Sequence, residues 1–288
     1  MSVALRIIPK LDIKGPNLVK GVHLEGLRVL GKPEVFAKYY YEQGADELFY
    51  QDVVASLYGR NCLQDIISKT AKEIFIPLTV GGGIRTIEDI SNILRAGADK
   101  VSINTAAIEN PKLITEASKI FGASTIVVSI EAIKQADGSY MAFTDNGRNP
   151  TGKDILSWAI EVNDLGAGEI ILTLVDSEGT GKGFDLEIIE KIYNSVSIPI
   201  VIHGGAGQKS DILNLFNRTP VSGVAISSMF HYNTISKFRS LEGYEMEGNI
   251  DFLMSNRNIK SIEILSINQL KEYLIFNNIN CRLYEESL

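Results

Sequence analysis

Eight short runs rich in isoleucine, valine and leucine recur along the chain, separated by stretches whose apolar residues have helical spacing. The runs are nearly continuous in apolar residues, which is typical of strands with both faces buried. They predict strands near residues 5–11, 47–53, 76–80, 99–103, 125–131, 169–175, 199–203 and 222–227. Helices are predicted over residues 33–44, 62–73, 86–96, 111–121, 155–165 and 267–278. Eight strand–helix units favour an α/β fold of the TIM-barrel type, a closed (β/α)8 barrel, over an open doubly wound sheet.

The pattern is repeated in two halves. The apolar run 76–80 leads into Gly81-Gly82-Gly83, and the run 198–202 leads into His203-Gly204-Gly205. Further matching positions at run ends are Asp12 with Glu131, Asp52 with Asp176, and Asn104-Thr105 with Ser227-Ser228. The members of each pair lie about 120 residues apart, a period far longer than that of solenoid repeats. The repeat predicts two half-barrels that close into one barrel.

Composition and length agree with one large domain. The chain has 288 residues, of which 45% are hydrophobic and 22% charged, as in a globular protein with a sizeable core. We expect residues 1–288 to form a single barrel. Two segments interrupt the regular pattern: a long loop over 15–32 and an insertion over 233–261 after the eighth strand. Both are expected to project from the C-terminal mouth, where barrel enzymes carry their chemistry.

Charge and cysteine content exclude several function classes. A net charge of −7 argues against a nucleic-acid partner. The sequence has no apolar stretch long enough for a membrane span and no N-terminal signal pattern. Cys62 and Cys281 are therefore expected to be free thiols in a reducing compartment, the cytoplasm. No CxxC or HExxH spacing occurs, so we expect no metal site and no other cofactor.

Asp12 and Glu131 are the first candidates for catalysis. They end the first and fifth predicted strands, which lie opposite each other in an eight-stranded barrel. Two carboxylates that face each other across a pocket can act as general acid and general base when their environments separate their pKa values. A single strand-end carboxylate can also cap a loop, but matching positions in both halves favour a functional pair.

Glycines that follow two matching strands predict two anion-binding sites. Glycine lets backbone N–H groups approach an anion closely, and the next strand of each half ends in a polar pair that adds donors. Two phosphate sites on opposite sides imply a long substrate phosphorylated at both ends. The residues expected to bind phosphate are Gly82, Gly83, Asn104 and Thr105 in the first half, and Gly204, Gly205, Ser227 and Ser228 in the second.

Two other side chains could serve the same pocket. Lys20 lies in the long first loop, where it could close over an anionic ligand or simply be solvated. Asp176, like its counterpart Asp52, could orient a hydroxyl group of a ligand, brace the catalytic pair or cap a loop.

A third group of charges marks the other end of the barrel. Two cations and two anions begin the first, second, fourth and sixth strands, where they could neutralise one another as a ring or be solvated at the rim. These residues are Arg6, Glu47, Lys100 and Glu169.

Several segments resemble the cyclase subunit of imidazole glycerol phosphate synthase. They are RIIPKLD (6–12), VGGGI (80–84), GADKVSINTAA (97–107), GAGEIILT (166–173) and GGAG (204–207). The resemblance covers nearly the whole chain except 233–261. It implies a two-fold symmetric barrel whose partner, a separate glutaminase subunit, docks at the N-terminal face and releases ammonia into the barrel.

The resemblance also implies a reaction. Ammonia joins a bis-phosphorylated ribulosyl imidazole carboxamide nucleotide, and imidazole glycerol phosphate and an aminoimidazole carboxamide ribotide are formed for histidine biosynthesis. Asp12 corresponds to the first catalytic carboxylate and Lys20 to the loop lysine. The phosphate-binding positions and the four charged residues, now interpreted as the gate of an ammonia passage, also match.

Three features depart from the family pattern. Glu131 stands where the family has aspartate, His203 replaces a small residue, and the 233–261 insertion is added. A carboxylate displaced by about 1 Å can cost about 100-fold in rate. These departures leave two alternatives open: a paralogue that supplies ammonia for an acetamidino sugar of a surface polysaccharide, and a scaffold that only activates its glutaminase.

Overall fold

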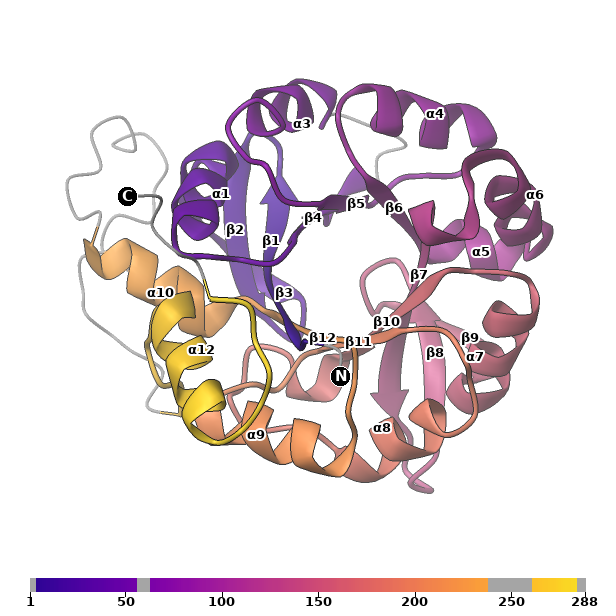
Figure 1. Ribbon diagram of the computed structural model, residues 1–288. Helices are drawn as coiled ribbons and strands as arrows, with labels where there is room; N and C mark the ends of the chain where they lie inside the picture. The colour runs from indigo at the N-terminus through magenta and orange to yellow at the C-terminus, as the bar shows by residue number, and fades with distance from the viewer. Residues whose placement is uncertain (1–3, 56–62, 238–260, 284–288) are drawn as a thin grey trace.

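The structure is a computed structural model that describes residues 4–55, 63–237 and 261–283. Its centre is a closed barrel of eight parallel strands, seen end-on in Figure 1. Around the barrel these are β1 (Arg6–Lys14), β4 (Leu48–Asp52), β5 (Leu78–Gly81), β6 (Lys100–Ile103), β7 (Ile126–Lys134), β10 (Glu169–Leu174), β11 (Ile200–His203) and β12 (Gly223–Ile226). Pairing of β7 with β10 and of β12 with β1 completes the circle, so the predicted (β/α)8 barrel is confirmed.

Helices surround the barrel, as Figure 1 shows. Those between or after barrel strands are α1 (Pro33–Glu42), α3 (Gln64–Thr70), α4 (Ile87–Arg95), α6 (Lys112–Phe121), α7 (Ile155–Asp164), α8 (Leu186–Tyr193), α9 (Lys209–Arg218) and α12 (Ile267–Phe276). Shorter or additional helices are α5 (Thr105–Glu109), α10 (Ser228–Lys237), and the 3₁₀ turns η1 (Ala123–Thr125) and η2 (Val175–Ser177). Local sequence sets their ends: Thr86 and Asp89 form a capping box at the start of α4, and Gly97 follows it at φ 117°.

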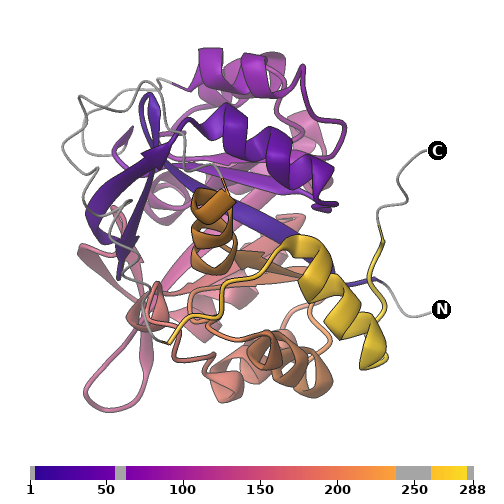
Figure 2. The ribbon, with the colours of Figure 1, turned by 90° about the vertical axis from the view of Figure 1, so that its left-hand side faces the viewer.

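Two antiparallel hairpins extend the barrel, one from the first strand of each half. β2 (Asn17–Val22) pairs with β1 and with β3 (Glu25–Gly31), while β8 (Tyr140–Thr144) pairs with β7 and with β9 (Asn149–Asp154). The segment 15–32, which was predicted as a long loop, instead forms strands whose backbone groups pair in a hairpin. In the side view of Figure 2 both hairpins lie at the same end of the barrel.

The 233–261 insertion falls mostly outside the described residues. Residues 233–237 form the end of α10, and residues 238–260 are not described. The expected projection of this segment from the mouth stays a prediction. In the described residues, no helix is long and apolar enough to cross a membrane.

Apolar side chains pack in two separate places. The larger core lies between the strands and the surrounding helices. A second cluster of six residues, one from each of six barrel strands, fills the barrel interior and is 0–2% exposed. We call this cluster the inner apolar layer; its members are Ile8, Phe49, Val127, Ile171, Val201 and Ala225. Because side chains alternate along a strand, residues two positions away on these strands also point into the barrel, above and below this layer.

Candidate functional site

The two predicted catalytic carboxylates lie at the same end of opposite strands. Asp12 is near the end of β1 and Glu131 near the end of β7, and β1 and β7 are four strands apart in the eight-stranded circle. Both are buried, at 2% and 8% exposure. Lys10 forms an ion pair with Asp12, and the charge of the same lysine also acts on Glu131. The charge of Lys10 therefore acts on both carboxylates, but Lys10 is in direct contact with Asp12 only.

Glu131 has no ion pair among the described residues. Its Oε2 atom accepts a hydrogen bond from the backbone N–H of Gly147, in the β8–β9 hairpin, at 2.8 Å. Burial raises the pKa of Glu131 to about 7, against the opposing effects of the Gly147 N–H and the Lys10 charge. A carboxyl group with this pKa can hold a proton near neutrality and release it, as a general acid must.

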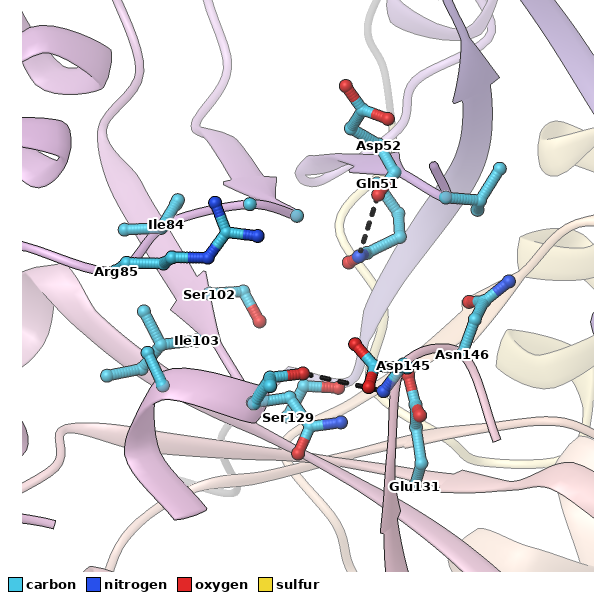
Figure 3. A pocket seen from close by; sticks show the side chains of 16 residues that line it. Gln51, Asp52, Ile84, Arg85, Ser102, Ile103, Ser129, Glu131, Asp145 and Asn146 are labelled. Carbon is cyan, nitrogen blue, oxygen red and sulfur yellow. Dashed lines mark hydrogen bonds between the residues drawn. The ribbon is translucent and has the colours of Figure 1, made fainter. Parts of the chain in front are cut away.

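The residues of the first predicted phosphate site line one pocket, which is shown in Figure 3. Gly82 and Gly83 have φ of 100° and 69°, and a Cβ on Gly82 would lie 2.3 Å from the carbonyl oxygen of Asp52. Only glycine fits this turn. The other predicted residues of the site, Asn104 and Thr105, also line the pocket, as do Glu131 and the side chains of Asp52, Arg85, Ser102, Ser129, Asp145 and Asn146.

The second half repeats this turn. Gly204 and Gly205 have φ of 86° and 126°, and a Cβ on Gly204 would lie 2.5 Å from the carbonyl oxygen of Leu174. In both halves the glycine therefore packs against the end of the preceding barrel strand. Ser227 is buried and its hydroxyl group donates to the carbonyl oxygen of Lys10 at 2.7 Å, while Ser228 begins α10.

Lys20 does not extend freely over the mouth. It lies on β2, is 4% exposed, forms an ion pair with Glu178 and donates to the carbonyl oxygen of Gly21 at 2.6 Å. Glu178 also accepts from the backbone N–H of Leu24 at 3.2 Å. The β2–β3 hairpin is thus attached to the segment after β10. Lys20 reaches an anionic ligand from this arrangement only by leaving Glu178.

The two matching aspartates have different surroundings. Asp52 accepts from the backbone N–H groups of Val54 and Ala55 at 3.0 and 2.9 Å, and burial raises its pKa. Asp176 is exposed and accepts from the backbone N–H of Lys134 at 2.7 Å. The carboxylate of Asp176 braces the end of β7, which carries Glu131, whereas Asp52 is one of the residues that line the first pocket.

The four charges at the opposite end form a closed ring. Arg6 contacts both Glu47, at 2.7 Å, and Glu169, and Lys100 contacts both acidic residues at 3.0 Å. Thr79 adds a hydrogen bond to Glu47 at 2.6 Å. Each cation thus bridges both anions, so the structure has the ring arrangement and not independent rim charges. We call these four residues the charged ring.

Sequence reasoning missed three contributors to the mouth. Lys10 points into the barrel because it lies two residues before Asp12 on β1, a spacing that the alternation of strand residues could have revealed. Glu178, the partner of Lys20, and the hairpin tip with Asp145 and Asn146 gave no comparable signal. His203, which we singled out, is buried with its Nδ1 atom 3.3 Å from the Thr173 hydroxyl, and burial lowers its pKa well below the ordinary value.

The described parts of the chain contain no group of three or more His, Cys, Asp or Glu side chains arranged to hold a metal ion.

Comparison with known proteins gives consistent matches. The family model described as "Histidine biosynthesis protein" matches residues 6–236. The HisF subunit of imidazole glycerol phosphate synthase from Legionella pneumophila is 56% identical over 204 residues, which cover 71% of this chain and 96% of that protein. The HisF subunit from Bacillus cereus (strain Q1) is 47% identical over 230 residues, covering 80% and 91% of the two chains.

The raised pKa of Glu131 predicts a pH-dependent stability. Between its ordinary pKa of 4.5 and the folded-state value of about 7, the folded protein binds more protons than the unfolded chain. The free energy of unfolding therefore falls as pH rises through this window, by up to about 3 kcal/mol. The Glu131→Gln variant keeps an acceptor for the Gly147 N–H group but cannot titrate. When the free energy of unfolding is measured in urea from pH 4.5 to 7.5, it should therefore fall less in this variant than in the unaltered protein. If the free energy of unfolding had the same dependence on pH in the two proteins, the expectation would be wrong.

Proposed function

This chain belongs to the family of histidine biosynthesis proteins, and from its similarity to HisF subunits we propose that it is the cyclase subunit of an imidazole glycerol phosphate synthase. In this role it is a lyase that uses ammonia to convert the bis-phosphorylated ribulosyl imidazole carboxamide nucleotide into imidazole glycerol phosphate and an aminoimidazole carboxamide ribotide. The observation that carries the proposal is the pair of opposed buried carboxylates at a mouth with a glycine turn on each side.

The carboxylate pair suits the chemistry of ammonia addition. Joining ammonia to a ketose carbon requires one group that takes a proton from nitrogen and another that gives a proton to oxygen. Asp12, in its ion pair with Lys10, and Glu131, with a pKa of about 7, are in unlike environments. This difference supports a division in which one carboxyl group is the general base and the other is the general acid.

The two glycine turns suit a substrate with a phosphate at each end. Gly82 and Gly83 line the first pocket together with Asn104 and Thr105. The equivalent turn at Gly204 and Gly205 lies across the barrel, next to Ser227 and Ser228. In the TIM-barrel fold, loops after the seventh and eighth strands commonly bind phosphate, which supports the second site.

The interior of the barrel suits the passage of neutral ammonia. The charged ring closes the N-terminal end, and the inner apolar layer separates it from the mouth. Ammonium would lose its hydration in this layer without compensation, whereas ammonia carries no charge. The ring therefore acts as a gate that a partner must rearrange.

We place the glutaminase partner on the N-terminal face. The two most exposed large apolar side chains of the described residues, Phe75 at 83% and Phe276 at 86%, lie after α3 and at the end of α12. Ile120, 60% exposed, lies in the last turn of α6. These helix ends are on the side where the barrel strands begin, around the charged ring. Exposed aromatic residues are typical anchors of protein interfaces.

Ammonia-dependent turnover of the nucleotide by the purified protein tests the proposed function. The Asp12→Asn variant should lose at least about 100-fold in rate while its thermal unfolding stays cooperative. Glu131→Asp serves as the comparison, since it keeps the carboxyl group and changes only its reach. Tight binding of the nucleotide without turnover by the unaltered protein would point to the scaffold alternative, and absence of both would point to another substrate.

The charged ring predicts a difference between two sources of ammonia. The Lys100→Ala variant leaves Glu47 and Glu169 with only Arg6 between them, so the ring no longer has its native arrangement. Turnover driven by glutamine and the glutaminase should fall about tenfold or more, and turnover driven by ammonium salt much less. An equal fall in both rates would exclude a gate function.

The docking face predicts the effect of a surface charge. Phe75→Glu should weaken binding of the glutaminase about thirtyfold or more, measured by calorimetry. The matched control is Val35→Glu, because Val35 is 49% exposed on α1 near the opposite end of the barrel. Equal affinities of the two variants would place the partner elsewhere.

A further inference from the structure

The two halves of the barrel differ at one inward-facing position next to the catalytic pair. Along β1 the inward residues are Arg6, Ile8, Lys10 and Asp12, and along β7 the matching series is Val127, Ser129 and Glu131. Ile8 and Val127 both belong to the inner apolar layer, which fixes the register of the comparison. Lys10 therefore corresponds to Ser129. The repeat supplies a carboxyl group on each side but a cation on only one.

Lys10 is held firmly in this position. Its side chain is 5% exposed, its ammonium group pairs with Asp12, and its Nζ atom lies 5.6 Å from the centre of the Phe49 ring. The Ser227 hydroxyl group holds the Lys10 backbone carbonyl at 2.7 Å. Phe49 is part of the inner apolar layer. The lysine thus lies between the end of the apolar passage and Asp12.

We propose that Lys10 is a positioning residue that, through its ion pair, holds the Asp12 carboxylate directed into the mouth, so that Asp12 takes the proton from ammonia and Glu131 supplies the proton to the substrate. This inference rests on the proposed function. Ammonia that leaves the inner apolar layer first meets the Lys10–Asp12 pair, whereas Glu131 is turned toward the hairpin N–H of Gly147. The surroundings of Asp12 and Glu131 differ because Lys10 is in direct contact with Asp12 only.

The step conserves atoms and charge. The nitrogen lone pair forms the C–N bond with the ketose carbon, and the carbonyl electrons move to oxygen, which takes a proton from Glu131. The nitrogen gives one proton to Asp12. The product of this step is a neutral carbinolamine, with Asp12 protonated and Glu131 ionised.

Other charged and titratable groups act on the same pair. Lys20 on β2 also acts on Asp12, but its ammonium group is paired with Glu178. His231 on α10 and His203 on β11 are buried and have lowered pKa values, so they are neutral near pH 7. At the end of β4, Asp52 is bound by backbone N–H groups. Across the barrel lies Glu131. Lys10 is the cation in direct contact with Asp12 among the described residues.

The test compares three substitutions at one position. Lys10→Met and Lys10→Gln remove the charge at similar length, and Lys10→Arg keeps it. In a pH profile of kcat/KM with ammonium salt as nitrogen source, the acid limb should move to higher pH by about one unit or more in both neutral variants. The alkaline limb should move less, because Lys10 touches Asp12 but only influences Glu131 at a distance. Lys10→Arg should restore the acid limb.

A second readout needs no turnover. In protein labelled with ¹³C at the aspartate carboxyl carbon, the Asp12 signal is identified by its loss in Asp12→Asn. It should begin to titrate at higher pH in Lys10→Met and Lys10→Gln than in the unaltered protein or Lys10→Arg. A uniform loss of rate at all pH values, or identical titration of the Asp12 signal in all proteins, would overturn the proposal. Failure of the unaltered protein to turn over the nucleotide would instead count against the proposed function, while the titration still tests Lys10.

Discussion

Charges that point into a closed barrel must find their counter-charges inside it, because the wall of strands excludes water from the interior. This constraint organises the molecule from end to end. At the N-terminal end it joins Arg6, Lys100 and two glutamates in the charged ring. At the mouth it joins Lys10 with Asp12. Glu131 lacks such a partner among the described residues, and its burial raises its pKa to about 7.

The strands and the two-fold repeat could be predicted from the sequence because burial on both faces leaves a strong apolar signal. The run at 169–175 became β10 (Glu169–Leu174), and Glu169 at its start pairs with Arg6. The glycine turns could also be predicted, since the positive φ of Gly82 and Gly204 is a local requirement of the backbone. These features depend on residues that are close in the sequence or on the matching positions of the two halves.

Other parts could not be predicted because they depend on partners far away in the chain. Glu178 becomes meaningful only when the β2–β3 hairpin brings Lys20 to it, 158 residues away in sequence. The hairpin itself was taken for a loop because β3 has few buried positions and therefore leaves only a weak apolar signal. Lys10 was overlooked because a lysine is normally solvated, and only the inward alternation of β1 places it inside the barrel.

The inner apolar layer has a consequence for proton movement. It places six hydrocarbon side chains, Ile8 and Phe49 among them, between the charged ring and the Lys10–Asp12 pair. Side chains of this kind neither donate nor accept protons, so none of the six can relay a proton between the two ionic centres. Under the proposed function, ammonia would cross this layer as a neutral molecule, and the protonation of one ionic centre would depend little on that of the other.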